Sequence, residues 1–247
     1  MSGAPLSDGR APECTGSATP RASLSASERR ELLDLLRRHF SGVTEDEFAK
    51  DLEDKEWVLR VRSGERLVGI STLKAYVSEF EGRRVNVIFS GDTIVDPVTW
   101  RSSILSREWI RLVKRLQEAR PDEPWYWLLI SSGWRTYRFL PVFRTEFFPR
   151  HDVETPPRVQ RLLEHLATER FGEHFVREEG IVRLARPQVL KDHLAEVPAG
   201  RILCPHVSYF LERNPGYHRG DELVCLTEIA DGKLTLAARR IIRGLSP

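Results

Sequence analysis

Long apolar runs, strong net charge and clustered cysteines are all missing from this 247-residue sequence. No apolar run approaches the length of a membrane span, and the first residues contain no hydrophobic signal region. The formal net charge is only +2, so composition gives no electrostatic reason to expect a nucleic acid as the main partner. We therefore expect no membrane span and no nucleic-acid partner.

Cysteine and histidine are also used sparingly. The cysteines Cys14, Cys204 and Cys225 are widely spaced and odd in number, without CxxC spacing, so we expect buried or idle thiols and a reducing, cytoplasmic setting. The seven histidines show neither HxxH nor HExxH spacing, and this predicts that no catalytic metal is bound. A G-x-S-x-G nucleophile elbow is missing too.

What the chain does contain is enough apolar material for a core: 40% of its residues are hydrophobic and 30% are charged. Residues 1–24 are rich in Ser, Gly, Pro and Ala and predict a disordered tail. The remaining pattern predicts a core over residues 25–150. A C-terminal extension over 151–247 is expected to pack on this core.

Two capping boxes predict two short helices at the start of the core. Ser25 to Glu28 precedes a run of leucines at helical spacing, and Thr44 to Glu47 precedes Phe48 and Leu52 one helical turn apart. The pattern then changes to a period of two. Alternating residues from Trp57, and the runs 66–76 and 84–95, predict three consecutive antiparallel strands joined by hairpins.

A strand-helix-strand crossover is predicted next. Residues 103–119 form an amphipathic helical pattern, and "WYWLLIS" (125–131) suits a strand buried on both faces. A helix disturbed near Pro141 follows. The order α-α-β-β-β-α-β-α predicts a mixed α/β sheet. Farther on, 156–171 is helical in pattern and "ELVCLTEI" is a strand candidate.

The stretch "GDTIVDPVTWRSSIL" (91–105) joins a strand end to a helix start through a loop. Unpaired N–H groups and the helix dipole favour an anion at such a junction. Arg101 could add a charge-assisted contact, and Ser102 and Ser103 could donate hydroxyls. The alternative is an ordinary capped helix with a surface arginine.

Together, the element order and this stretch resemble the GNAT superfamily of acyl-CoA-dependent N-acyltransferases, over about residues 25–148. Val95-Asp96-Pro97 matches the V-x-P-like end of the family's central strand, and residues 100–105 stand where its pyrophosphate loop Q/R-x-x-G-x-G/A lies. "WYWLLISSGWRTYRFL" looks like the family's next strand and its tyrosine-bearing helix, with Tyr137. Both loop glycines are absent, which makes this chain a divergent member.

The resemblance implies a fold, a donor and a reaction. An acyl-CoA would lie in a cleft between the central strand and the "WYWLLIS" strand. Its pantetheine would pair with the backbone of Thr93, Ile94 and Val95, and its pyrophosphate would lie on Arg101, Ser102, Ser103, Ile104 and Leu105. By direct transfer in a ternary complex, the acyl group would pass to an amine of a small molecule or peptide, with Asp92 as base and Tyr137 as acid. The C-terminal extension over 151–247 would cover the side on which this acceptor binds.

Each of these roles has an alternative. Asp92 could serve a turn, since Gly91 suggests a bulge beside it. Tyr137 could be a core aromatic, and Arg135 and Arg138 could bind the 3′-phosphate of CoA or form a solvated helix face. An acyl carrier protein could be the donor in place of free CoA. A third function is a GNAT-like protein that binds CoA or a metabolite without turnover.

Overall fold

The computed structural model describes residues 14–100 and 102–244, and their main feature is a mixed sheet of eight strands in the order β1-β3-β4-β5-β6-β10-β8-β7. The central pair β5 and β6 is parallel, and the other neighbours are antiparallel. The strands of this sheet are β1 (Cys14–Pro20), β3 (Trp57–Ser63), β4 (Arg66–Phe80), β5 (Arg83–Val95), β6 (Trp125–Ser131), β7 (Phe175–Val176), β8 (Ile181–Val182) and β10 (Glu222–Glu228). A separate two-stranded pair joins β2 (Phe40–Ser41) to β9 (Val189–Leu190).

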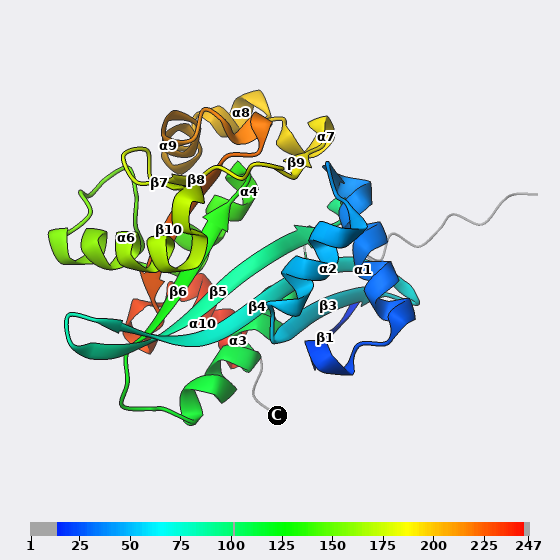
Figure 1. Cartoon of the computed structure of the whole chain (residues 1–247), viewed down its shortest axis with the longest axis horizontal. Coiled ribbons are helices and arrows are strands. Elements are labelled where there is room, and N and C mark those ends of the chain that lie inside the picture. The colour runs from blue at the N-terminus through cyan, green and yellow to red at the C-terminus, as the bar shows by residue number, and fades with distance from the viewer. Residues whose placement is uncertain (1–13, 101, 245–247) are drawn as a thin grey trace, which may run out of the picture.

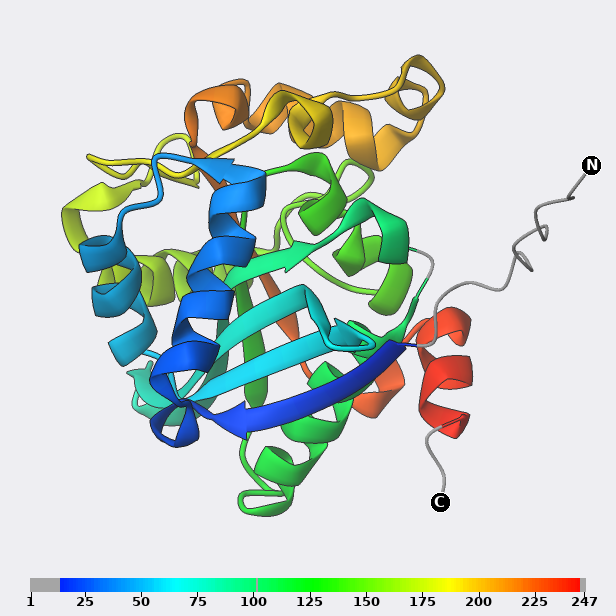
Figure 2. The same ribbon diagram turned by 90° about the vertical axis from the view of Figure 1, so that its right-hand side faces the viewer.

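Helices cover both faces of the large sheet (Figures 1 and 2). They are α1 (Ala26–His39), α2 (Glu45–Glu53), α3 (Ile104–Glu118), α4 (Trp134–Tyr137), α5 (Phe139–Phe143), α6 (Pro157–Phe171), α7 (Asp192–Ala195), α8 (Ala199–Ile202), α9 (Pro205–Arg213) and α10 (Leu236–Arg243). The first face, which we call face A, carries α1, α2 and α6. The opposite face, face B, carries α3 in the largest core cluster, and α10 packs against α3 and α5. None of the helices within the described ranges is long and apolar enough to cross a membrane.

The predicted α/β fold class and element order are confirmed. The chain runs α1-α2-β3-β4-β5-α3-β6-α4, and β6 matches the predicted strand residue for residue. At α1 the capping box is complete, because Ser25 accepts from the Glu28 N–H and Glu28 accepts from the Ser25 N–H. Pro141 accompanies a break into the short helices α4 and α5, as its pattern predicts.

The tail predicted for residues 1–24 is wrong from Cys14 onward, where strand β1 and a 3₁₀ turn (Arg21–Ser23) are formed. Strand β1 pairs with β3 along its whole length. Its small residues are required by packing: a Cβ on Gly16 would approach Ile104 Cγ2 to 2.5 Å and Glu108 Cγ to 2.6 Å on α3. Backbone pairing and a close helix thus stabilise a strand that offers few apolar side chains. Residues 1–13 lie outside the described part.

The boundary predicted at residue 150 does not divide the sheet. Strand β10, from the C-terminal segment, pairs with β6 from Leu223↔Ser131 to Glu228↔Tyr126. Helix α6 packs on β4 and β10. The segment from β9 to α9 lies across one end of the sheet (Figure 1). Residues after 150 are therefore part of the same core.

Candidate functional site

The site begins where β5 and β6 separate. Their parallel pairing runs from Asn86↔Trp125 to Ser90↔Leu129, whereas β5 continues to Val95. Just beyond Ser90 the register between β4 and β5 shifts, so that Gly91 and Asp92 together oppose Thr72. This is the β-bulge that the sequence suggested at Gly91, and bulges bend the strand that carries them. The predicted opening between these two strands is therefore present.

The bulge also decides which side chains lie on which face. Ser90 and Thr93 line a cavity on face B together with Trp109 of α3. Gly91 is directed to face A, because a Cβ there would lie 2.6 Å from Lys55 Cε. Asp92 lies on face A too, where the charges of Asp51 and Lys55 act on it. Residues 90–93 of β5 are thus divided between the two faces, with Ser90 and Thr93 on face B and Gly91 and Asp92 on face A.

A cleft of about 660 Å³ occupies the opening. Of the residues predicted to bind the donor, six line it: Thr93, Ile94, Val95, Ser102, Ser103 and Leu105. Ile104 does not, because its side chain packs into the core beside Gly16. Arg101 lies outside the described residues. The structure therefore brings together most of the predicted donor-binding set.

The free backbone groups of β5 are fewer than the sequence predicted. Asp96 N–H donates to Val68 O at 2.7 Å, and in this register the backbone groups of Ile94 also point toward β4. Thr93 and Val95 turn theirs toward the opening. The Trp100 indole donates to Val95 O at 2.8 Å and occupies that acceptor. The groups left for a ligand are the N–H and C=O of Thr93 and the N–H of Val95.

At the cleft, α3 presents a helix start without a side-chain cap. Ser103 is its N-cap residue but makes no capping hydrogen bond, and the first turn contains no acidic residue. Ser102 Oγ accepts from Ile104 N–H at 3.3 Å. Leu105 and Ser106, in the first turn, line the cleft. These features suit an anion at this helix start.

Arginines surround the same cleft. Arg135, Arg138 and Arg201 line it, which favours a ligand-binding role over a fully solvated helix face for the first two. The Arg135 guanidinium lies 4.2 Å from the ring centres of both Trp100 and Trp134. Burial, followed by the positive charge of Arg201, lowers the pKa of Arg135. Sequence reasoning placed Trp100 in the loop 100–105 but missed Arg201, because only the fold brings residue 201 beside residue 135.

On face A, carboxyl groups gather around Asp92. Burial raises the pKa of Asp92 and the negative charge of Asp51 raises it further, whereas Lys55 lowers it. Glu222, the first residue of β10, has a pKa raised to about 8 by burial and by the charges of Asp92 and Asp51. Sequence reasoning missed Glu222 as a partner of Asp92. An ionisable carboxyl with a raised pKa suits a general base.

Lys55 is the cation of this cluster, and its side chain is fully buried. Its Nζ donates to Asp51 Oδ1 at 2.5 Å and to Asp51 O at 3.1 Å, and lies 3.8 Å from Asp54 Oδ2. Lys55 thus lies beside Asp51, Asp54 and Asp92, and Asp54 is also paired with Lys74 and Arg170.

Tyr137 does not reach the cleft. Its side chain is completely buried, packs against Phe147 and Phe210, and donates its hydroxyl to Pro149 O at 2.9 Å. Burial raises its pKa far above the usual range, which makes proton donation harder. This position supports the core alternative and leaves the acid role without a geometric basis.

Metal ligands and reactive thiols do not define the site. Within residues 14–100 and 102–244, no group of His, Cys, Asp and Glu side chains is arranged to hold a metal ion. Cys204 and Cys225 are free thiols, and burial raises the pKa of Cys225.

Comparisons with known proteins give partial similarities. A scan against models of protein families and a search of curated proteins find no match. Among solved structures, a probable N-acyltransferase from Enterococcus faecalis matches at 15% identity and a TM-score of 0.40, over 54% of this chain and 33% of that one. Escherichia coli ElaA matches at 15% identity and 0.38, over 58% and 93%.

A GNAT family N-acetyltransferase from Escherichia coli, solved in complex with CoA, matches at 14% identity and a TM-score of 0.37, over 49% of this chain and 65% of that one. The matched part spans only about a third of the Enterococcus faecalis chain. At these scores the similarities carry no assignment of activity. The GNAT-like arrangement rests on the element order and on the opening between β5 and β6.

Proposed function

We propose that this protein is an N-acyltransferase that binds an acyl-CoA in the cleft between β5 and β6 and transfers the acyl group directly to an amine. The observation that carries this proposal is the opening itself. Backbone groups of β5 beyond its pairing with β6, a start of α3 whose N-cap residue Ser103 makes no capping hydrogen bond, and three arginines meet in one cleft. An elongated thioester with a pyrophosphate matches each of these features in turn.

The donor is positioned from both ends. The pantetheine amides pair with the free N–H and C=O of Thr93 and the N–H of Val95, as an added strand would. The pyrophosphate lies at the start of α3, where Leu105 and Ser106 line the cleft. Arg135, Arg138 or Arg201 supplies positive charge to the remaining phosphate. The thioester carbon then lies beside Thr93, which lines the cleft. Asp92 does not line the cleft, so the acceptor amine approaches from face A, where the Asp92 carboxyl lies.

Asp92 serves as the base for the acceptor, an amine-bearing small molecule or peptide. Its carboxylate removes a proton from the amine, whose nitrogen attacks the thioester carbon. The tetrahedral intermediate collapses with cleavage of the C–S bond, forming an amide. The departing thiolate takes a proton from water in the open cleft, since Tyr137 lies in the core. The raised pKa of Asp92 allows it to hold the proton that it accepts.

A substitution at Ser106 tests the donor site. Ser106→Glu places a carboxylate in the first turn of α3, where the dipole tolerates it, but where it repels a pyrophosphate. We expect the affinity for CoA, measured by calorimetry, to fall by about tenfold or more. In the control Ser106→Gln, the introduced side chain has about the size of glutamate but no charge, so this variant should retain most of the affinity for CoA. Equal losses in both variants, or no CoA binding by the unmodified protein, would refute the donor site.

A second function, binding of CoA without turnover, is favoured by the burial of Tyr137, because no phenol lines the cleft within the described residues. The two functions separate in one assay. The transferase predicts loss of the acyl group from bound acyl-CoA when a panel of amines is added, followed by mass spectrometry. Stable acyl-CoA with every amine would favour the binding protein.

A further inference from the structure

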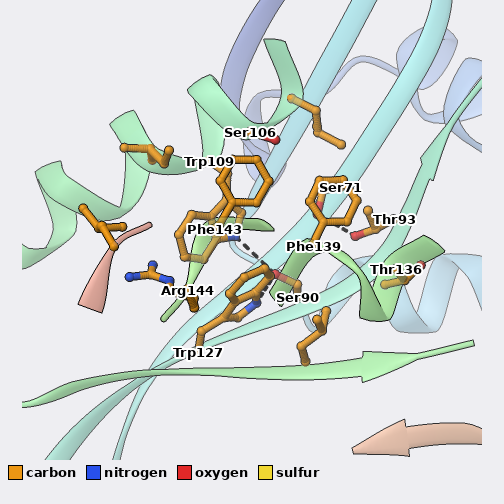
Figure 3. Close-up of a pocket in the computed structure, with 14 residues that line it drawn as sticks. Ser71, Ser90, Thr93, Ser106, Trp109, Trp127, Thr136, Phe139, Phe143 and Arg144 are labelled. Carbon is orange, nitrogen blue, oxygen red and sulfur yellow. Dashed lines mark hydrogen bonds between the residues drawn. The ribbon is translucent and has the colours of Figure 1, made fainter. Parts of the chain in front are cut away.

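A small cavity of about 50 Å³ continues the cleft on face B (Figure 3). The two share six lining residues, Thr93, Leu105, Ser106, Thr136, Phe139 and Phe143. Since roughly 10–15 Å³ of such space accommodates one water-sized group, the cavity holds roughly three to five non-hydrogen atoms. Its position makes it the natural place for the far end of a short acyl chain whose thioester lies in the cleft.

Most of the cavity wall is apolar, and several of its polar groups bond to one another. Ser90 Oγ accepts from the indoles of Trp127 and Trp109 at 2.9 and 3.3 Å. Ser71 and Thr93 share a hydrogen bond of 2.8 Å. Figure 3 draws these bonds as dashed lines. The serines that surround the cavity are thus largely satisfied within the protein.

Arg144 is different. Of the fourteen described residues that line the cavity, it alone carries a charge, and its side chain is only 4% exposed. Its Nε and Nη1 have no hydrogen-bond partner within the described residues. Its guanidinium lies 5.8 Å from the ring centre of Trp109, and Asp231 acts on it only at longer range. An unpaired buried cation is costly, and proteins normally supply it with a partner.

We propose that the missing partner is the distal carboxylate of the acyl group, so that the donor carries a short dicarboxylic acyl group. The CH₂–COO⁻ end of a succinyl or malonyl thioester has four non-hydrogen atoms and matches the size of the cavity. The carboxylate would accept charge-assisted hydrogen bonds from the two free N–H groups of Arg144. A plain acetyl or straight alkyl group leaves that cation unpaired. This inference rests on the proposed function, because it assigns the donor of the same cleft.

Matched thioesters test the assignment. Succinyl-CoA and 4-methylpentanoyl-CoA have acyl groups of the same shape, but only the first is charged at its end. Calorimetry with the full chain should show succinyl-CoA binding about tenfold or more tighter than the neutral analogue. In Arg144→Met that preference should vanish or reverse while the affinity for CoA itself stays unchanged. Arg144→Lys should retain part of it.

The outcomes of these experiments distinguish a failure of this inference from a failure of the proposed function on which it rests. If CoA binds but the unmodified protein does not prefer the charged acyl group, the assignment of the donor is wrong and the transferase stands. A preference that survives Arg144→Met also overturns it, since Arg144 would then not be the partner. If neither CoA nor any acyl-CoA binds, the proposed function and this inference both fail. Should Arg144→Met not fold, the comparison of the two thioesters in the unmodified protein and in Arg144→Lys decides.

Discussion

Lys55 and Arg144 are buried cations on opposite faces of the same sheet, and their surroundings differ. Lys55, on face A, donates to Asp51 and lies near Asp54 and Asp92. Arg144, on face B, lines an apolar cavity and has two N–H groups without partners in the described part of the chain. Face A therefore carries a cation in direct contact with a carboxylate, whereas on face B Asp231 acts on Arg144 only at longer range and no described residue accepts from its Nε or Nη1.

Under the proposed function, the bulge in β5 separates proton transfer on face A from recognition of a charged acyl group on face B. Proton transfer needs ionisable groups that neighbours control, and Asp92 lies among such groups on face A. Recognition of a charged ligand needs an unpaired charge held in a shaped space, which Arg144 provides on face B. Because Ser90 and Thr93 flank Gly91 and Asp92 in β5, both tasks meet within four residues.

The largest effect that we expect is on catalysis at face A. Asp92→Asn removes the base and should slow single-turnover acyl transfer about a hundredfold or more, with acyl-CoA affinity unchanged. In the unmodified protein the base must be ionised, so the rate of acyl transfer should rise with pH. Because the pKa of Asp92 is raised, the midpoint of this rise should lie above the usual pKa range of aspartate. Asp51→Asn removes the negative charge that raises the pKa of Asp92 and should therefore move this rise in rate to lower pH. Unchanged turnover in Asp92→Asn would remove it from the mechanism.

The next effect compares the two cations by stability. Lys55→Met removes the counter-charge of Asp51 and Asp92, whereas Asp54 keeps its ion pairs with Lys74 and Arg170. We expect it to lower the free energy of unfolding by about 2–3 kcal/mol. This is below the usual cost of breaking a fully buried pair, since Asp51 keeps 39% of its side-chain surface exposed. Arg144→Met has no ion pair to break and should cost nothing or stabilise. Urea denaturation measures both.

The pH dependence of this comparison follows from Asp92. Its pKa is raised in the folded state, so its contribution to stability is full at low pH and is lost as pH rises through that raised pKa. Lys55→Met raises the pKa of Asp92 further and enlarges this loss. The destabilisation should therefore be smaller at pH 5 than at pH 8. Equal costs for Lys55→Met and Arg144→Met at both pH values would break the contrast between the faces.

The smallest effect concerns Tyr137. Tyr137→Phe removes the hydroxyl that donates to Pro149 O and should lower stability by about 1 kcal/mol, without slowing the chemical step. A thermal-unfolding measurement and a single-turnover assay on the same sample separate the two. A slower chemical step at unchanged stability would restore the acid role that the resemblance implied.

The helices and strands could be predicted from the sequence more completely than the residues of the candidate site. Caps and periodicity are local signals, so α1, the meander β3-β4-β5, α3 and β6 were all predicted. Sequence reasoning failed at β1, whose small residues read as a disordered tail. The reason is that Gly16 is required by the approach of α3, a contact about ninety residues away in the chain.

The sequence by itself determined the α/β order, the bulge at Gly91, and a strand-loop-helix junction suited to an anion. Only the tertiary structure decided which side chains share the site. It placed Tyr137 in the core, brought Arg201 beside Arg135 and placed Glu222 near Asp92. It also left Arg144 Nε and Nη1 in a cavity wall without partners among the described residues. The physical reason is that a local pattern records the neighbours of a residue along the chain, whereas charge pairing and burial depend on neighbours across the sheet.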